Sequence, residues 1–211
     1  MAVGTIISRI TGFIGGVIMI ATLGTALLAD AFNVANTMPN ILYNLLVGGA
    51  LTAIFVPQLV RAFDDADGGH LFASRLVTTI SGILLVLVVI GVILAPQLVY
   101  IYAPSFSTPG FETEREIAIA FTRYCLPQIF FLGLFTMLGQ VANARGSFAP
   151  LMWAPIANNL IVIVVFSAFL LKWPSISVDS ITDAQIQILG WGTTAGIIIQ
   201  PPKPQNPLFP S

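Results

Sequence analysis

Residues 76–95 read LVTTISGILLVLVVIGVILA, a run that contains no charged side chain. A helix rises about 1.5 Å per residue and the hydrocarbon core of a bilayer is about 30 Å thick, so about 20 mainly apolar residues are needed to cross it. Pro96 closes this run. A second uncharged run, residues 149–171, is followed by Lys172. The two runs therefore predict membrane-spanning helices.

The composition of the whole chain supports the same class of fold. Of its 211 residues, 56% are hydrophobic and 8% are charged, whereas soluble domains carry about 25% charged residues. So few charged groups cannot cover the surface of a soluble domain. The net charge is -1, and the lack of a basic patch argues against a nucleic-acid partner. We predict an all-α fold, a polytopic transmembrane helix bundle of about six helices.

Charged or proline-containing segments separate the expected helices. The predicted helices cover residues 5–28, 31–63, 74–102, 115–143, 149–171 and 184–200, all within one domain of residues 1–200. The last is short for a span and stops at Pro201. The Pro-rich residues 201–211 are expected to be a disordered tail. The first helix lacks a basic head and a clear cleavage site, so we expect it to be retained.

Lysine and arginine positions predict the orientation, because cytoplasmic loops are enriched in both. With the N-terminus in the cytoplasm, that side holds Arg61, Arg75, Arg145 and Lys203. The other side then holds Arg115 and Lys172, with Arg123 nearby. The bias favours a cytoplasmic N-terminus.

Two polar features lie inside predicted spans. Arg9 is either a cavity residue or a side chain that reaches back to the headgroups. The second feature is the segment 30–44, DAFNVANTMPNILYN. Asp30 opens it, and helical spacing places its four asparagines on one helix face: Asn33, Asn36, Asn40 and Asn44.

This asparagine stripe has two interpretations. It could line a hydrophilic cavity, with Pro39 breaking the helix and providing a hinge, or it could hydrogen-bond neighbouring helices. We favour the cavity because one face holds so many polar groups. Pro155, followed by Asn158 and Asn159, predicts a second break, which is tolerated at membrane depth only beside protein or a cavity.

The remaining features predict structure and not chemistry. The pairs Gly12 with Gly16 and Gly192 with Gly196 have the spacing of close helix packing. Cys125 is expected to be a buried packing residue, and His70 to be solvated. The chain has no phosphate-binding loop, zinc-protease motif or nucleophile motif. We therefore expect no enzyme activity, no metal site and no cofactor.

Three segments together resemble a known family. They are SRITGF from Ser8, the long segment from Asp30 to Pro57, and NARGSFAPLMWAPIANN from Asn143 to Asn159. In this order and spacing they resemble the N-terminal part of the MurJ/MviN lipid II flippases, within the superfamily of multidrug, oligosaccharidyl-lipid and polysaccharide exporters. The resemblance covers about residues 4–200.

The resemblance implies a transport function. Members of this family have about fourteen helices in two lobes, and they are taken to move an undecaprenyl-diphosphate-linked peptidoglycan precursor across the bacterial inner membrane by alternating access. Arg9, Asp30, Pro39 and Asn40 match family positions. Two family arginines proposed to hold the diphosphate correspond here to Gly15 and Tyr43.

Three functional hypotheses follow. The first is a truncated lipid II flippase that comprises the first lobe, with the lipid-linked precursor and membrane lipids as partners. It requires either the missing second lobe or a second copy. The second is another exporter of the same superfamily, for a polysaccharide-lipid or a drug. The third is a membrane assembly fragment that transports nothing, in which the asparagine stripe serves helix packing.

Overall fold

The computed structural model describes residues 2–24, 27–45, 57–58, 61–62, 69–144, 149–174 and 176–198. The regular elements of these residues are all helical, and they form a bundle. In chain order they are α1 (Ala2–Leu23), α2 (Leu27–Tyr43), α4 (His70–Ile93), α5 (Ala95–Tyr102), the short η2 (Pro104–Ser107), α6 (Glu112–Cys125), α7 (Gln128–Ala144), α8 (Ala149–Lys172) and α9 (Asp183–Ile198).

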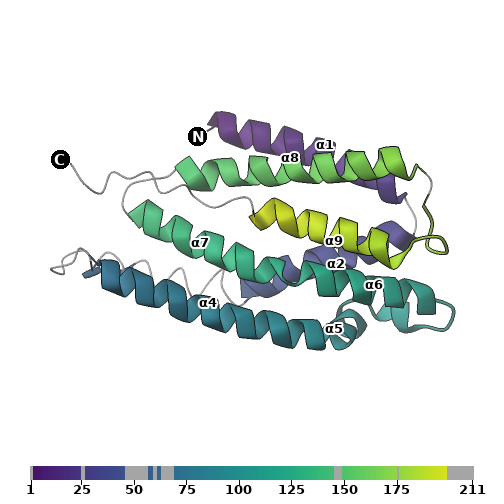
Figure 1. Cartoon of the computed structure of the whole chain (residues 1–211), viewed down its shortest axis with the longest axis horizontal. Helices are drawn as coiled ribbons and strands as arrows, with labels where there is room; N and C mark the ends of the chain where they lie inside the picture. Colours follow the sequence, from purple (N-terminus) through teal and green to yellow (C-terminus); the bar gives the residue numbers. More distant parts are fainter. Residues whose placement is uncertain are drawn as a thin grey trace.

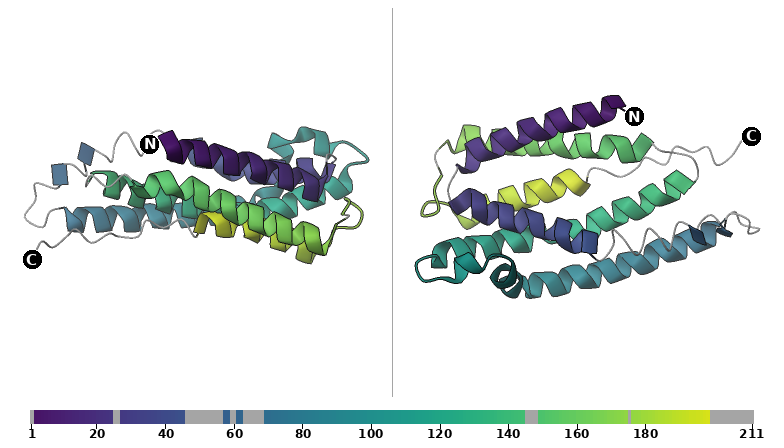
Figure 2. Two further views of the ribbon diagram at one scale, coloured as in Figure 1. Left: turned by 90° about the horizontal axis from the view of Figure 1, so that it is seen from above. Right: turned by 180° about the vertical axis from the view of Figure 1, so that it is seen from behind.

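The helices lie side by side along one common direction (Figure 1). α1 packs along α8 at one edge of the bundle, and α4 packs along α7 at the opposite edge. Between these edges, α2 lies against α6 and α7, and α9 lies against α6, α7 and α8. The views in Figure 2 agree with this order. Helices that are far apart in the sequence, such as α1 and α8, therefore share the longest interfaces.

The first predicted boundary is wrong by several residues. The expected helices 5–28 and 31–63 meet near residue 30, but α1 ends at Leu23 and α2 begins at Leu27. Gly24 has φ 77° and its N–H bonds the Ile20 carbonyl at 2.8 Å. Glycine takes this left-handed conformation at little cost, which ends a helix. The rest of the expected helix 31–63 lies largely outside the described residues.

Two predicted helices are each divided in two. The expected helix 74–102 consists of α4 and α5 with a break at Leu94, and the expected helix 115–143 consists of α6 and α7 with a break at Leu126 and Pro127. Proline has no N–H to donate, and its ring collides with the carbonyl four residues earlier. Pro96, in the first turn of α5, and Pro127 account for these breaks. The expected helices 149–171 and 184–200 correspond to α8 and α9.

Neither Pro39 nor Pro155 ends its helix, and a hinge at either proline stays a prediction. α2 continues through Pro39, and α8 continues through Pro155. Pro39 has no N–H to donate to the Ala35 carbonyl four residues earlier. The Asn40 side chain donates from Nδ2 to the next carbonyl, that of Asn36, at 3.2 Å.

Among the residues that the structure describes, four stretches are long and apolar enough to cross a membrane: Gly4–Leu23, Leu71–Ile93, Glu112–Val141 and Pro155–Lys172. Large apolar side chains of α4 are exposed along it, among them Leu85, Val89 and Ile93. Exposed apolar side chains on this scale are expected where lipid covers the protein. The bundle therefore has the character of a membrane protein.

Aromatic side chains fix the position of α2 within the bundle. Phe32 of α2 makes edge-on contacts with Phe121 of α6, at 5.2 Å between ring centroids, and with Phe166 of α8, at 5.4 Å. All three rings are buried. Cys125 is buried in the same core, one helical turn after Phe121. The core places the first half of α2 against α6 and α8.

Candidate functional site

α2 presents a polar face to the outside of the described bundle. Asp30, Asn33, Asn40 and Asn44 are exposed, and Asn44 lies one residue beyond the helix end. Thr37 shares this face and its Oγ1 bonds Asn33 Oδ1 at 3.4 Å. Asn36 differs from the others, because it is partly buried and turned toward the inside. The stripe is thus divided between an exposed face and the interior of the bundle.

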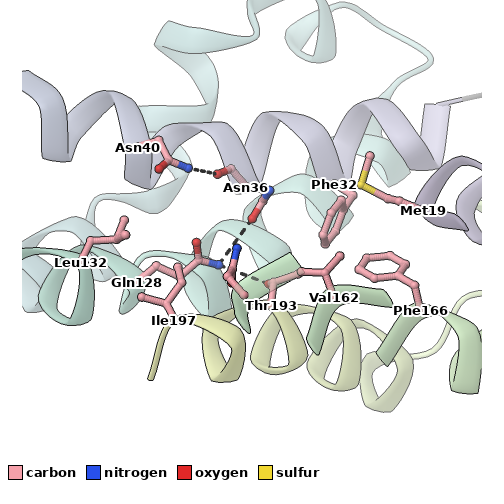
Figure 3. Close-up of a pocket in the computed structure, with 11 residues that line it drawn as sticks. Met19, Phe32, Asn36, Asn40, Gln128, Leu132, Val162, Phe166, Thr193 and Ile197 are labelled. Carbon is pink, nitrogen blue, oxygen red and sulfur yellow. Dashed lines mark hydrogen bonds between the residues drawn. The ribbon is translucent and has the colours of Figure 1, made fainter. Parts of the chain in front are cut away.

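A cavity of about 140 Å³ lies behind this face. Side chains from α1, α2, α7, α8 and α9 surround it, as Figure 3 shows for most of them. The lining residues are Met19, Phe32, Asn36, Asn40, Gln128, Leu132, Asn158, Val162, Phe166, Thr193 and Ile197. Since Asn40 is exposed and also lines the cavity, the cavity adjoins the exposed polar face of α2.

A hydrogen-bond network centred on Gln128 connects three helices beside the cavity. Gln128 Nε2 donates to Thr193 Oγ1 of α9 at 3.2 Å and, over a longer 3.5 Å, to Asn36 Oδ1 of α2. Its side chain is 1% exposed. Figure 3 shows the three side chains converging. The network holds α2, α7 and α9 together at the level of Asn36.

The sequence interpretation did not identify Gln128 or Thr193 as site residues. Gln128 follows Pro127 within an otherwise apolar run, and a polar side chain in such a run is itself a signal for a buried contact. Thr193 lies inside the Gly192 and Gly196 pair, which we interpreted only as a packing motif. Both signals were present, but neither residue could be placed beside Asn36 without the packing of α7 and α9 against α2.

Two neighbouring asparagines of α8 point to different partners. Asn159 Nδ2 donates to the Ser8 carbonyl of α1 at 2.9 Å and to Thr11 Oγ1 at 3.1 Å. Asn158 instead lines the cavity, and its Oδ1 is buried without a hydrogen-bond partner among the described residues. Asn159 therefore connects α8 to α1, whereas the side-chain oxygen of Asn158 has no hydrogen-bond partner among the described residues and belongs to a side chain that lines the cavity.

The other predicted site residues lie apart from the cavity lining. Arg9 is exposed on α1. By helical spacing it shares a side of α1 with Gly12, Gly16 and Met19, and Met19 lines the cavity. The Tyr43 hydroxyl makes a 2.6 Å hydrogen bond with Thr136 Oγ1 of α7. This bond joins the end of α2 to α7.

The lining of the cavity carries amides, a hydroxyl and apolar groups, and its residues have no ionisable side chain. Within the described ranges, no group of three or more histidine, cysteine, aspartate or glutamate side chains could hold a metal ion. The arrangement can form hydrogen bonds with uncharged groups. Arg145, Lys203 and the predicted tail 201–211 lie outside the described residues.

The apolar spans, the exposed apolar surface of α4 and the polar face of α2 define a polytopic α-helical membrane protein. The family described as "Lipid II flippase MurJ" matches residues 19–201 of this sequence. Because the match covers most of the chain, the chain belongs to the lipid II flippase MurJ family.

Curated relatives agree with this assignment. A probable lipid II flippase MurJ of Rickettsia prowazekii is 26% identical over 189 residues, which are 88% of this chain and 37% of the relative. One of Buchnera aphidicola is 26% identical over 93% of this chain and 37% of the relative. The lipid II flippase MurJ of Burkholderia cenocepacia is 29% identical over 93% of this chain and 36% of the relative. The chain thus spans little more than a third of these relatives.

Proposed function

We propose that this chain forms one wall of the cavity through which a MurJ-type flippase moves its lipid-linked peptidoglycan precursor across the bacterial inner membrane. The main support is the exposed polar face of α2, which contrasts with the exposed apolar side chains of α4, such as Leu85, Val89 and Ile93. Unpaired amide and carboxylate groups are costly to bury in lipid. The α2 face is therefore expected to meet water, cargo or protein.

A second wall is needed for alternating access, since cargo must lose contact with one side of the membrane before it meets the other. The nine described helices of one bundle provide only one side of such a path. The facing wall would come from the remainder of a full-length relative or from a second copy of this chain. Asp30, Asn33, Asn40 and Asn44 would face it across water, and Arg9 would supply a positive charge at the cavity margin.

The proposed orientation places the N-terminus in the cytoplasm. α1, α4 and α8 all begin at one end of the bundle, and α2, α6 and α9 begin at the other (Figure 1). Arg75 is in the second turn of α4, at the first end, and Lys172 closes α8 at the second. The lysine and arginine excess counted over the whole sequence favours the first end as cytoplasmic.

Photo-crosslinking to the cargo tests the proposed function. A photoreactive amino acid would replace Asn33, which is exposed on α2 and outside the cavity lining, or, as a lipid-facing control, Val89, in membranes that contain radiolabelled lipid II. We expect a covalent adduct at Asn33 that excess unlabelled lipid II suppresses, and only weak, unsuppressed labelling at Val89. Equal labelling at both positions would contradict a cargo wall and favour a bundle in which the asparagines serve packing alone. Suppression by a different lipid-linked sugar, but not by lipid II, would indicate another exporter of the superfamily.

A further inference from the structure

The cavity behind α2 is lined by two kinds of side chain. Five are uncharged and polar, and the others are apolar, with Phe32, Val162 and Phe166 together at the end away from Asn40 (Figure 3); the polar ones are Asn36, Asn40, Gln128, Asn158 and Thr193. A ligand that fits this lining needs both hydrogen-bonding atoms and a small apolar group. This requirement excludes ligands that are polar all round.

The lining also excludes strongly charged ligands. A phosphate or carboxylate would find no cationic side chain in it, and charge-assisted bonds are what such groups require when they leave water. A metal cation would need converging oxygens. The oxygens of Asn36 and Thr193 already accept from Gln128 Nε2, whose N–H groups would repel a cation. The ligand is therefore a neutral group.

Asn158 indicates which hydrogen-bonding atom the ligand carries. Its Oδ1 is an acceptor without a donor, and a buried acceptor left unpaired is costly. This oxygen lies against Gly196, where a Cβ atom would come within 2.5 Å of it. A half turn of the carboxamide would direct the oxygen into the cavity that the same side chain lines. The missing partner is then an N–H or O–H donor.

The size of the cavity limits the ligand to a substituent. Its 140 Å³ is close to an engineered cavity of about 150 Å³ that holds benzene, so a group of four heavy atoms fits and a whole disaccharide does not. The rest of the ligand must then lie outside. Asn40 is exposed on the polar face of α2 and also lines the cavity. The substituent would therefore enter the cavity beside Asn40.

We propose that this cavity binds an acetamido group, the N-acetyl substituent of an amino sugar. Its N–H donates to Asn158 Oδ1, its carbonyl accepts from the second hydrogen of Asn40 Nδ2, and its methyl group packs against Phe32 and Phe166. Peptidoglycan precursors are built from N-acetylated amino sugars, so the identity of the natural sugar rests on the proposed function. Binding of an acetamido group to this cavity does not rest on the proposed function.

Ligand-observed NMR on the purified full chain in lipid nanodiscs tests the proposal. The probes are methyl N-acetylglucosaminide and methyl glucoside, which differ in the acetamido group. Saturation transferred from the protein should be strongest at the acetyl methyl protons, and the glucoside should receive little. In Asn158→Leu, loss of the hydrogen bond should weaken N-acetylglucosaminide binding about fivefold or more.

The controls separate binding from folding. Gln187→Leu removes an amide of α9 that is exposed and outside the cavity, and it should bind as the parent chain does. Gly196→Ala places a methyl group where Asn158 Oδ1 lies, and it should weaken binding as Asn158→Leu does. Equal saturation of both sugars, no saturation of either, or unchanged binding by Asn158→Leu would overturn the proposal. None of these results would affect crosslinking of lipid II at Asn33, which is outside the cavity lining and tests the proposed function separately.

Discussion

Asn159 Nδ2 of α8 donates a hydrogen bond to the main-chain carbonyl of Ser8 in α1 across 2.9 Å. The same nitrogen lies 3.1 Å from Thr11 Oγ1, so a single amide connects two turns of α1 to α8. Thr22 Oγ1 makes a third link, to the Phe166 carbonyl at 3.2 Å. These hydrogen bonds join residues that are more than 140 positions apart in the sequence, and they hold α1 against α8.

Replacement of Asn159 by leucine should therefore destabilise the bundle. Hydrogen bonds between membrane helices contribute about 0.6 kcal/mol on average and up to about 1.7 kcal/mol, and Asn159→Leu removes two. We expect a loss within this range in the free energy of unfolding, measured by denaturation in mixed micelles. The matched control is Asn158→Leu, which removes an unpaired oxygen and should leave stability unchanged or raise it. Equal losses in both variants would contradict the assigned roles.

The glycines of the two packing motifs should differ in their tolerance of a methyl group. A Cβ atom at Gly192 would lie 2.5 Å from Val165 Cγ1, whereas a Cβ at Gly16 would meet nothing within 4 Å. Overpacking costs about 1–3 kcal/mol, so Gly192→Ala should lower the unfolding free energy by this amount. Gly16→Ala should be neutral or stabilising, since alanine favours helix over glycine by about 0.5–1 kcal/mol. Comparable losses would show that α8 and α9 do not approach as described.

The class of fold could be predicted from the sequence because it depends on the length of apolar runs. The run ending at Pro96 and the run ending at Lys172 each correspond closely to a helix end. Helix boundaries that depend on a single residue were harder to predict from the sequence. Gly24 ends α1, yet mainly apolar segments precede and follow it in the sequence, so hydrophobicity alone placed the boundary too late.

The site could be predicted only in part, for a physical reason. Helical periodicity places Asn33, Asn40 and Asn44 on one face, and they do share an exposed face. Periodicity within one helix says nothing about which other helix packs beside it. The approach of Gln128 and Thr193 to Asn36, and the different partners of Asn158 and Asn159, depend on contacts between distant helices.

The topology should place the two ends of the bundle on opposite sides of the membrane. Thr108 lies in the exposed segment between η2 and α6, at the end opposite to the start of α1. Asp67 belongs to an acidic loop expected from the sequence. In a variant without Cys125, a cysteine at Thr108 should react with an impermeant thiol reagent on intact cells, and one at Asp67 should react only after lysis. The reverse pattern would contradict a cytoplasmic N-terminus.

Residues 1–211 expressed alone should not replace a lipid II flippase. The chain would form only one wall of the proposed cavity, and Gly15 and Tyr43, where the resemblance to the family implies arginines, supply no charge for a diphosphate. In cells depleted of their own flippase, we expect no recovery of growth and no lipid II at the outer leaflet. Recovery would contradict this prediction and favour two copies of this chain as the working unit.

The most direct test of the central claim is the water accessibility of the α2 face. Single cysteines at Asn33, Asn40 and Asn44 would be compared with one at Val89, which is also exposed but lies on the apolar surface of α4. A small charged thiol reagent reacts with thiolates in water and not with thiols in lipid. In native membranes, we predict rapid labelling at all three α2 positions and protection at Val89. Protection of the α2 cysteines to the same degree as Val89 would contradict the claim that this face lines a transport cavity.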